Sequence, residues 1–187
     1  TAKPHQGTHR TNGFASASPC TDGERVYAHF GSRGLYCYSL DGELQWKRDD
    51  LGKMDTRNSF GEGSSPTITG DKIIVPWDHE GPSSLYALDR LTGKTLWVRA
   101  REEGSSWTTP RVTTHDGREL IIVNGHVRTR CYDAQTGDVL WECGGHTENV
   151  IPMPVVGFGR VYCASGFRGN TMQAIKLGRS GDLTGTD

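Results

Sequence analysis

The sequence predicts an all-β fold of about four repeated units, each with four antiparallel strands, and two recurring landmarks predict it. The first landmark is a short strand, a glycine turn and a tryptophan in fixed order, found at 37–46, 87–97 and 131–141. Counted between the turn glycines, these copies lie 51 and 44 residues apart, and a further 44 residues lead to Gly181. A period of this length is typical of repeat architectures.

A proline that begins each unit keeps the same spacing. Pro19, Pro66, Pro110 and Pro154 are 47, 44 and 44 residues apart. The prolines and the glycine turns are independent landmarks, so their agreement supports four units.

The second unit shows the expected strands most clearly. Segments 64–69, 72–77, 84–89 and 95–100 are short, rich in Ile, Val, Thr, Tyr and Trp, and separated by Gly, Pro, Asp or Ser. This composition is typical of β-strands joined by tight turns. The unit therefore reads as four antiparallel strands.

The apolar run of the second strand predicts how the units pack. Ile73, Ile74 and Val75 follow one another without polar alternation, so both faces of this strand should be covered. Four-stranded units of about 44 residues that stack face to face around an axis form a β-propeller, each unit being one blade. We expect blades at about 16–50, 62–101, 105–145 and 150–187, after a polar N-terminal segment, 1–15.

The remaining units fit the same scheme, but the fourth is incomplete. Their expected strand segments are 20–30, 35–40 and 44–49; 111–116, 119–125, 129–134 and 139–144; and 153–159, 160–166 and 172–178. A tryptophan should follow Gly181 by four residues, yet position 185 is Gly185. We therefore expect the last blade to lack its outer strand. The array should belong to a larger ring of seven or eight blades, or be covered at its open ends by another copy.

Composition excludes several classes of function. The formal net charge is −1, with 21 basic and 22 acidic residues spread along the chain, so no footprint for nucleic acid or a membrane surface is expected. The apolar stretches are too short to span a bilayer, and no signal peptide is visible. Five cysteines without a CxxC pair indicate packing rather than a disulfide framework or a metal site.

The string from Ala87 to Trp97, ALDRLTGKTLW, closely resembles the tryptophan-docking motif of the PQQ-repeat (quinoprotein-like) β-propellers. In that family the tryptophan packs against the small first residue and the glycine peptide and locks neighbouring blades. The resemblance gives this blade-locking role to three sets of residues: Trp97 with Ala87 and Gly93, Trp141 with Cys131 and Gly137, and Trp46 with Cys37 and Gly42. The first copy is one residue shorter, and the fourth keeps Ala174 and Gly181 without a tryptophan.

Candidate ligand or partner residues lie on one face of the predicted array. The turns between first and second and between third and fourth strands are short and stereotyped, whereas the loops of the opposite face are long and varied, and such loops usually carry function. The polar residues of this varied-loop face are Arg33, Asp55, Arg57, Asn58, Glu62, Asp78, His79, Glu80, Asn124, His126, Arg128, Glu148, Asn149, Arg168 and Asn170. Arginines there could grip an anionic group and carboxylates a cation, or the charges could pair locally with little effect.

One loop of this face is longer than its counterparts, and it is a plausible binding loop. The 51-residue interval makes the crossing at about 48–63 an insertion, and it carries Met54, Arg57, Asn58 and Phe60. It could equally be a longer connection without a ligand. No metal site is predicted, because the seven histidines show no ligand spacing, although His79 and His126 could approach each other.

The resemblance leaves two functions open. Some members of the family bind pyrroloquinoline quinone with Ca²⁺ and oxidise alcohols or sugars, often with a disulfide between adjacent cysteines, and this chain has no adjacent pair. Other members carry no cofactor and act as binding platforms. We expect a noncatalytic binding or scaffold module without a cofactor, periplasmic or extracellular by resemblance; the alternative is a fragment of a PQQ-dependent alcohol or sugar dehydrogenase. Fold alone does not decide between them.

Overall fold

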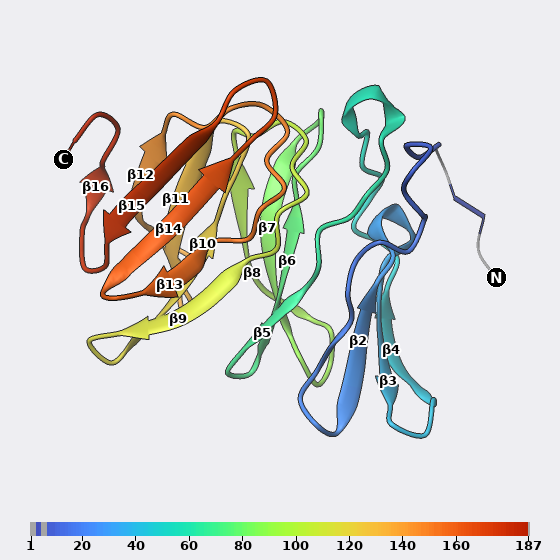
Figure 1. Cartoon of the computed structure of the whole chain (residues 1–187). Coiled ribbons are helices and arrows are strands. Elements are labelled where there is room, and N and C mark those ends of the chain that lie inside the picture. Colours follow the sequence, from blue (N-terminus) through green and yellow to red (C-terminus); the bar gives the residue numbers. More distant parts are fainter. Residues whose placement is uncertain (1–2, 5–6, 187) are drawn as a thin grey trace.

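The computed structural model describes residues 3–4 and 7–186 and contains four antiparallel sheets in chain order (Figure 1). The first sheet consists of β1 (Cys20–Thr21), β2 (Arg25–His29), β3 (Leu35–Ser39) and β4 (Leu44–Arg48). The second consists of β5 (Thr67–Thr69), β6 (Lys72–Trp77), β7 (Ser83–Asp89) and β8 (Thr95–Arg101). Each is a meander in which neighbouring strands in sequence are neighbours in space.

The third and fourth sheets repeat this order, except that the last strand of the chain joins the third sheet and not the fourth. The third contains β9 (Arg111–His115), β10 (Arg118–Val123), β11 (Arg128–Asp133), β12 (Val139–Gly144) and, added to its edge, β16 (Gly181–Asp182). The fourth contains β13 (Val155–Gly157), β14 (Arg160–Ser165) and β15 (Thr171–Lys176). Among the described residues the helical segments are two short 3₁₀ turns, η1 (Gly31–Arg33) and η2 (Arg57–Ser59). The all-β prediction is confirmed.

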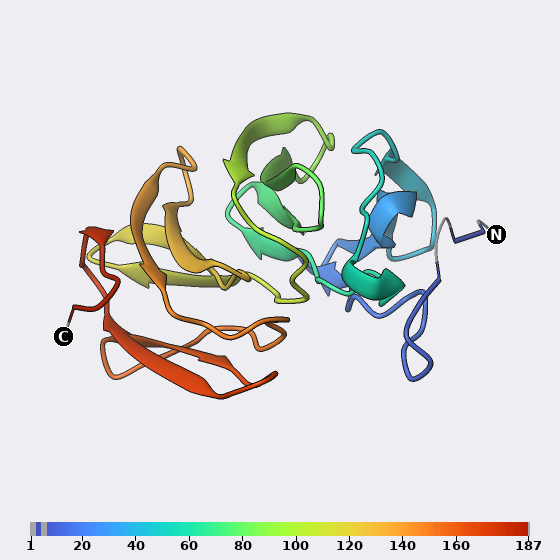
Figure 2. The same ribbon diagram turned by 90° about the horizontal axis from the view of Figure 1, so that it is seen from above.

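The sheets follow one another around an arc, as Figure 2 shows from above, and an apolar core fills each space between neighbours. The second strand of the second sheet explains the stacking. Ile73 and Val75 pack toward the first sheet with Tyr27, whereas Ile74 packs toward the third sheet with Ile121. All of these side chains are fully buried, so the predicted coverage of both strand faces is confirmed.

Two of the three docking tryptophans, Trp46 and Trp97, lie opposite the small residue of their own sheet but against the glycine turn of the next sheet. The third, Trp141, pairs with Cys131, but a Cβ added at Gly181 of the following unit would meet nothing within 4 Å. Trp97 pairs with Ala87 across β7 and β8, yet its indole meets Gly137, where an added Cβ would lie 2.7 Å from the ring. Its Nε1–H donates to the carbonyl oxygen of Ala134 at 3.4 Å. In the same way, Trp46 pairs with Cys37 and meets Gly93. The glycine partner expected from the motif therefore has to be moved one unit along the chain.

An arginine two residues after the tryptophan strengthens the same contact. Arg48 donates to the carbonyl oxygen of Gly93 at 2.8 Å, and Arg99 donates to the carbonyl oxygens of Gly137 and Thr136 at 3.0 and 2.7 Å. The guanidinium thus binds the same turn of the next sheet against whose glycine the indole packs. The motif did not single out these arginines.

The fourth sheet has three strands because the chain leaves it after β15. Residues Gly181 and Asp182 pair in parallel with Trp141 and Glu142 of the third sheet. Leu183 is buried there in the core that also contains Trp141. The expected absence of an outer strand in the fourth unit is thus accompanied by an unexpected addition to the third.

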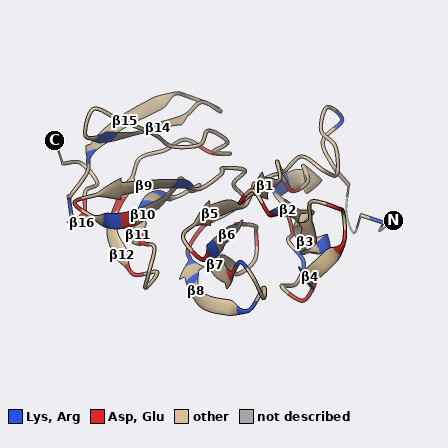
Figure 3. Cartoon of the chain, turned by 90° about the horizontal axis from the view of Figure 1, so that it is seen from below, with Lys and Arg blue, Asp and Glu red and all other residues tan. Residues whose placement is uncertain are grey.

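Charges and thiols are arranged as the composition indicated. Figure 3 shows basic and acidic residues interspersed over the four sheets. All five cysteines are free, and burial raises the pKa of the Cys131 and Cys163 thiols to about 12. Across residues 3–4 and 7–186, we find no helix with the length and hydropathy that crossing a bilayer requires.

Candidate functional site

The varied loops gather at the end of the array that is uppermost in Figure 1, and five of them form a polar cluster there. We call it the loop-face cluster: Arg57, Glu80, Ser105, His126 and Glu148. Arg57 comes from the crossing that follows the first sheet, Glu80 from the β6–β7 loop, Ser105 from the β8–β9 crossing, His126 from the β10–β11 loop and Glu148 from the β12–β13 crossing.

Ser105 connects the cluster. Its hydroxyl accepts a hydrogen bond from the backbone N–H of Arg57 at 2.8 Å and donates to Oε1 of Glu80 at 2.8 Å. The guanidinium of Arg57 forms an ion pair with Glu148 at 3.1 Å. Segments separated by up to 91 residues are thereby held together, because Arg57 and Glu148 come from different crossings.

Glu80 is the exposed anion of the cluster. Burial raises its pKa, but hydrogen bonds from the hydroxyl and the N–H of Ser105, together with nearby Arg57 and His126, outweigh that effect. The pKa of Glu80 therefore lies below the ordinary value of a glutamic acid. At neutral pH the cluster presents a carboxylate beside a guanidinium and an imidazole, an arrangement that suits a polar protein surface of mixed charge.

A buried ion pair supports these loops from below. Arg101 binds Asp78 through two hydrogen bonds of 2.7 and 3.0 Å, and both side chains are fully buried. Ser106 donates to the same carboxylate at 2.8 Å, and Arg101 also donates to the hydroxyl of Tyr132. The pair joins the β6–β7 loop to the end of β8. Asp78, expected on the ligand face, is instead committed to this contact.

Glu103 holds the next loop in the same manner. Its carboxylate accepts from the backbone N–H of Val127 at 2.6 Å and from that of Arg128 at 3.3 Å, and it forms an ion pair with Arg130. Burial, the largest influence, raises the pKa of Glu103 against the effects of Arg101 and the Val127 N–H. Gly125 approaches this carboxylate so closely that a side chain there would collide with it.

Three further expected ligand residues serve the loop framework. His79 is buried and its Nδ1 accepts from the N–H groups of Asp55 and Gly81 at 3.2 and 3.1 Å. Asn124 is fully buried and donates to the carbonyl oxygen of Pro152 at 2.9 Å. Glu62 accepts from the N–H of Ser32 at 2.8 Å.

The other expected residues do not belong to the cluster. Arg128 forms ion pairs with Asp182 and Glu142 at the outer edge of the third sheet, so it lies away from the cluster. Asn58, Asn149 and Arg168 adopt positive φ angles of 52°, 55° and 53°. The remaining expected residues are Arg33, which is partly buried, and Asn170, which is exposed.

Within the long first crossing, half of the expected binding residues are structural. Met54 is 5% exposed and packs in the core between the first two sheets. Phe60 contacts Trp107 and His9, with ring centroids 6.2 and 5.3 Å apart. Arg57 and the exposed Asn58 remain on the surface of this crossing.

Three residues that position the cluster were not predicted from the sequence: Arg101, Glu103 and Ser105. A signal was present, because charged residues directly follow the apolar part of β8, where the packing against neighbouring sheets ends. The described His, Cys, Asp and Glu side chains form no group of three that could hold a metal ion.

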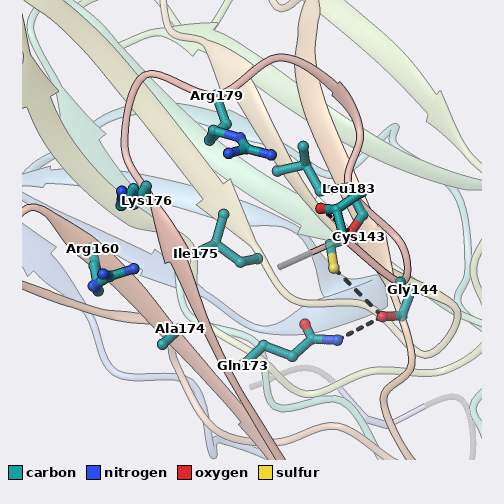
Figure 4. A pocket seen from close by; sticks show the side chains of 11 residues that line it. Cys143, Gly144, Arg160, Gln173, Ala174, Ile175, Lys176, Arg179 and Leu183 are labelled. Carbon is teal, nitrogen blue, oxygen red and sulfur yellow. Dashed lines mark hydrogen bonds between the residues drawn. The ribbon is translucent and has the colours of Figure 1, made fainter.

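A hollow lies between β12 and β15, outside the loop-face cluster, and has a volume of about 430 Å³ (Figure 4). Gln173 spans it and donates to the carbonyl oxygen of Gly144 at 2.5 Å. Arg160, Lys176 and Arg179 line it. Among the described residues, none of these three cations has a carboxylate within ion-pair distance, so an anionic group would fit here.

Stacked four-stranded sheets, joined by tryptophans that dock on the following turn, define a repeat protein of the β-propeller class. A family model described as outer membrane protein assembly factor BamB matches residues 8–106 and 81–184. The chain therefore belongs to this PQQ-repeat family. A comparison with curated protein sequences finds no match.

Solved structures show the same fold at low sequence identity. BamB from Moraxella catarrhalis is 22% identical with a TM-score of 0.55, over 80% of this chain and 43% of that one. A quinohemoprotein alcohol dehydrogenase from Comamonas testosteroni is 16% identical with a TM-score of 0.60, over 86% of this chain and 30% of that one. The computationally designed Ika4 protein is 11% identical with a TM-score of 0.58, over 93% and 99%. The chain thus spans less than half of the two natural relatives.

Proposed function

We propose that this chain is a noncatalytic binding module that engages a protein partner through the loop-face cluster. The observation that carries the proposal is the convergence of Arg57, Glu80, His126 and Glu148 from four separate loops on one surface. Two buried carboxylates, Asp78 and Glu103, hold the loops in place. A rigid surface of this kind favours binding because less conformational entropy is lost on association.

The family description suggests the class of partner. Since the matching family is described as an outer membrane protein assembly factor, we propose a component of outer-membrane protein assembly. This partner implies a location in the periplasm or at the cell exterior. The mixed charges of the cluster would determine the orientation of the bound partner more than its affinity.

Site-directed photo-crosslinking in intact cells of the source organism tests the proposal. A photoreactive phenylalanine derivative at position 80 reports on the cluster, and the same derivative at the exposed Lys94, in a short turn of the opposite face, is the control. We expect an adduct with an assembly component from position 80 and none from position 94. Equal adducts from both positions, or an adduct only from position 94, would contradict the proposal.

The alternative is a fragment of a PQQ-dependent dehydrogenase, because quinohemoprotein alcohol dehydrogenases share the fold. The residues do not fit the cofactor well. The buried carboxylates of this face, Asp78 and Glu103, are engaged by arginines, and the five free cysteines include no adjacent pair. We therefore derive no catalytic step. Stoichiometric binding of the quinone with Ca²⁺, together with dye-linked alcohol or sugar oxidation, would favour this alternative.

A further inference from the structure

The outer edge of β15 is open. In each of the first three sheets a fourth strand pairs with the third strand, through Cys37 and Trp46, Ala87 and Trp97, or Cys131 and Trp141. Across the described residues, β15 pairs with β14 alone. Its backbone N–H and C=O groups on the other side are therefore available to another strand.

The segment that follows β15 does not fill this edge. Gly181 and Asp182 pair with β12, Asp182 forms an ion pair with Arg128 at 2.9 Å, and Thr184 accepts from the N–H of Gly144 at 2.9 Å. Leu183 is buried in the neighbouring core. These contacts commit the segment to the third sheet, so among the described residues it leaves the outer edge of β15 without a partner strand.

The hollow described above lies at this edge. Its lining includes four consecutive residues of β15, 173–176, and on the opposite side Cys143 and Leu183 (Figure 4). At about 430 Å³ it is within the size range of ligand pockets. Figure 4 shows Arg160, Lys176 and Arg179 around the same hollow. An acidic occupant would neutralise these cations.

The register of the complete sheets specifies which residue of an occupant would meet which position. The small residue before the turn faces a tryptophan in each complete sheet, and Ala174 holds this position in the fourth because it pairs with Tyr162 as Cys37 pairs with Tyr27. An aromatic side chain is therefore expected opposite Ala174.

Two more positions follow from the same register. The residue two before the tryptophan pairs with the position equivalent to Ile175, and it is Leu44, Thr95 or Val139 in the complete sheets. The residue three before the tryptophan binds the backbone at the position equivalent to Lys176. Arg160 pairs directly with Lys176, so this residue would be acidic.

We propose that the open edge of β15 binds, in trans, an extended segment of another protein with the pattern acidic, apolar, any residue, aromatic. The segment adds a fourth strand to the fourth sheet. Its aromatic residue covers Ala174, and its acidic residue lies beside Lys176, the residue that pairs with Arg160. This surface is separate from the loop-face cluster, so the two proposals can fail independently.

The chain itself supplies a probe with this pattern. Residues 137–144 contain Asp138 three positions before Trp141, and a labelled peptide GDVLWESG reproduces them with serine in place of Cys143. The matched control is GKVLWESG, in which only the acidic position is reversed. Binding to the whole chain is measured by fluorescence anisotropy. We expect saturable binding of the acidic peptide and binding of the control weakened at least about tenfold.

Charge exchange tests the site. The exposed pair Lys176→Glu with Arg179→Glu should reverse the preference so that GKVLWESG binds better than GDVLWESG. A third peptide with N-methylated backbone groups should lose binding to the unmodified chain, because it cannot pair with β15. Equal affinity for both charged peptides, unchanged preference in the double variant, or no saturable binding up to about 1 mM would overturn the proposal.

Discussion

The indole of Trp97 lies against Gly137, the turn glycine of the following sheet, and not against Gly93 of its own unit. The same relationship joins Trp46 to Gly93. Because each of these two tryptophans belongs to one sheet and its glycine partner to the next, the motif residues form a contact between units. Neighbouring sheets should therefore unfold together.

Replacing Gly137 with alanine should lower the free energy of unfolding more than replacing Gly117. Both glycines have positive φ angles, 75° and 77°, so alanine is strained by a similar amount, about 1 kcal/mol, at either position. At Gly137 the new Cβ would also lie 2.7 Å from Trp97, whereas it meets nothing within 4 Å at Gly117. We expect an additional loss of about 1–3 kcal/mol in urea unfolding. Equal losses would contradict the docking geometry.

The buried pair of Asp78 and Arg101 should show strong coupling. Asp78→Asn leaves a fully buried guanidinium without its charge partner, which should cost about 3–5 kcal/mol. The double variant with Arg101→Met should cost less than the sum of the single variants, because it leaves no buried charge at this pair. A double-mutant cycle from urea unfolding measures the difference. Additive effects would show that the two residues do not act as a unit.

His29 should make the fold sensitive to acid. Burial lowers the pKa of His29 from 6.5 to about 4, although its hydrogen bond with the carbonyl oxygen of Ser64 opposes this. Above pH 6.5 the ring is neutral in both states. Between pH 6.5 and pH 4 only the unfolded chain takes up the proton, so the free energy of unfolding decreases as the pH is lowered. Below pH 4 the folded chain takes up the proton too, and the free energy of unfolding decreases no further through His29.

The His29 contribution should reach about 3 kcal/mol at pH 4. The variant His29→Phe should lack this part of the pH dependence when urea unfolding is compared at pH 7 and pH 4. His115→Phe, at a partly exposed histidine of β9, should keep it. A steep acid dependence that persists in His29→Phe would assign the effect to other groups.

The cysteines should react slowly in the folded chain. Burial raises the pKa of Cys20 to about 11 and that of Cys131 and Cys163 to about 12, so little thiolate exists at pH 8. Alkylation followed by mass spectrometry should therefore label these thiols only after denaturation. Rapid labelling of Cys131 in the native chain would contradict its burial between the third and fourth sheets.

The end of the array at the fourth sheet should promote association between copies. Met172 and Val155 are 72% and 62% exposed on strands of that sheet. Sedimentation velocity should show concentration-dependent association that Met172→Glu weakens and Leu96→Glu, at an exposed position of β8, does not. A concentration-independent monomer would contradict the expectation that copies cover the open ends.

Periodicity in the sequence was sufficient to predict the sheets. The segments expected at 72–77 and 84–89 correspond to β6 and to β7, which begins one residue earlier. Alternation and turn residues are local properties, so they mark strands reliably. The partner of Trp97 could not be predicted in this way, because the spacing within one unit does not reveal which sheet the indole meets.

The candidate site was only partly predictable, since loop position does not determine burial. Arg57, Glu80, His126 and Glu148 lie together, as residues of one loop face can, but Asp78 turns inward because Arg101 is there to pair with it. Partners such as Arg101 are distant from Asp78 in sequence, and the sequence of their strand predicts only a packing role. The exchange of β16 to the third sheet had no sequence signal that we recognise.

The affinity of the partner for charge-reversed variants tests the central claim, that the loop-face cluster is the binding surface. The partner identified by crosslinking at position 80 is titrated against Arg57→Glu and against Lys94→Glu, an exposed reversal in a turn of the opposite face. Both variants should unfold near the urea concentration of the unmodified chain, because charges on a partly exposed residue such as Arg57 and an exposed one such as Lys94 contribute little to stability. We predict that Arg57→Glu weakens binding at least about tenfold and that Lys94→Glu leaves it unchanged. Unchanged affinity for Arg57→Glu, or an equal loss in both variants, would contradict the account.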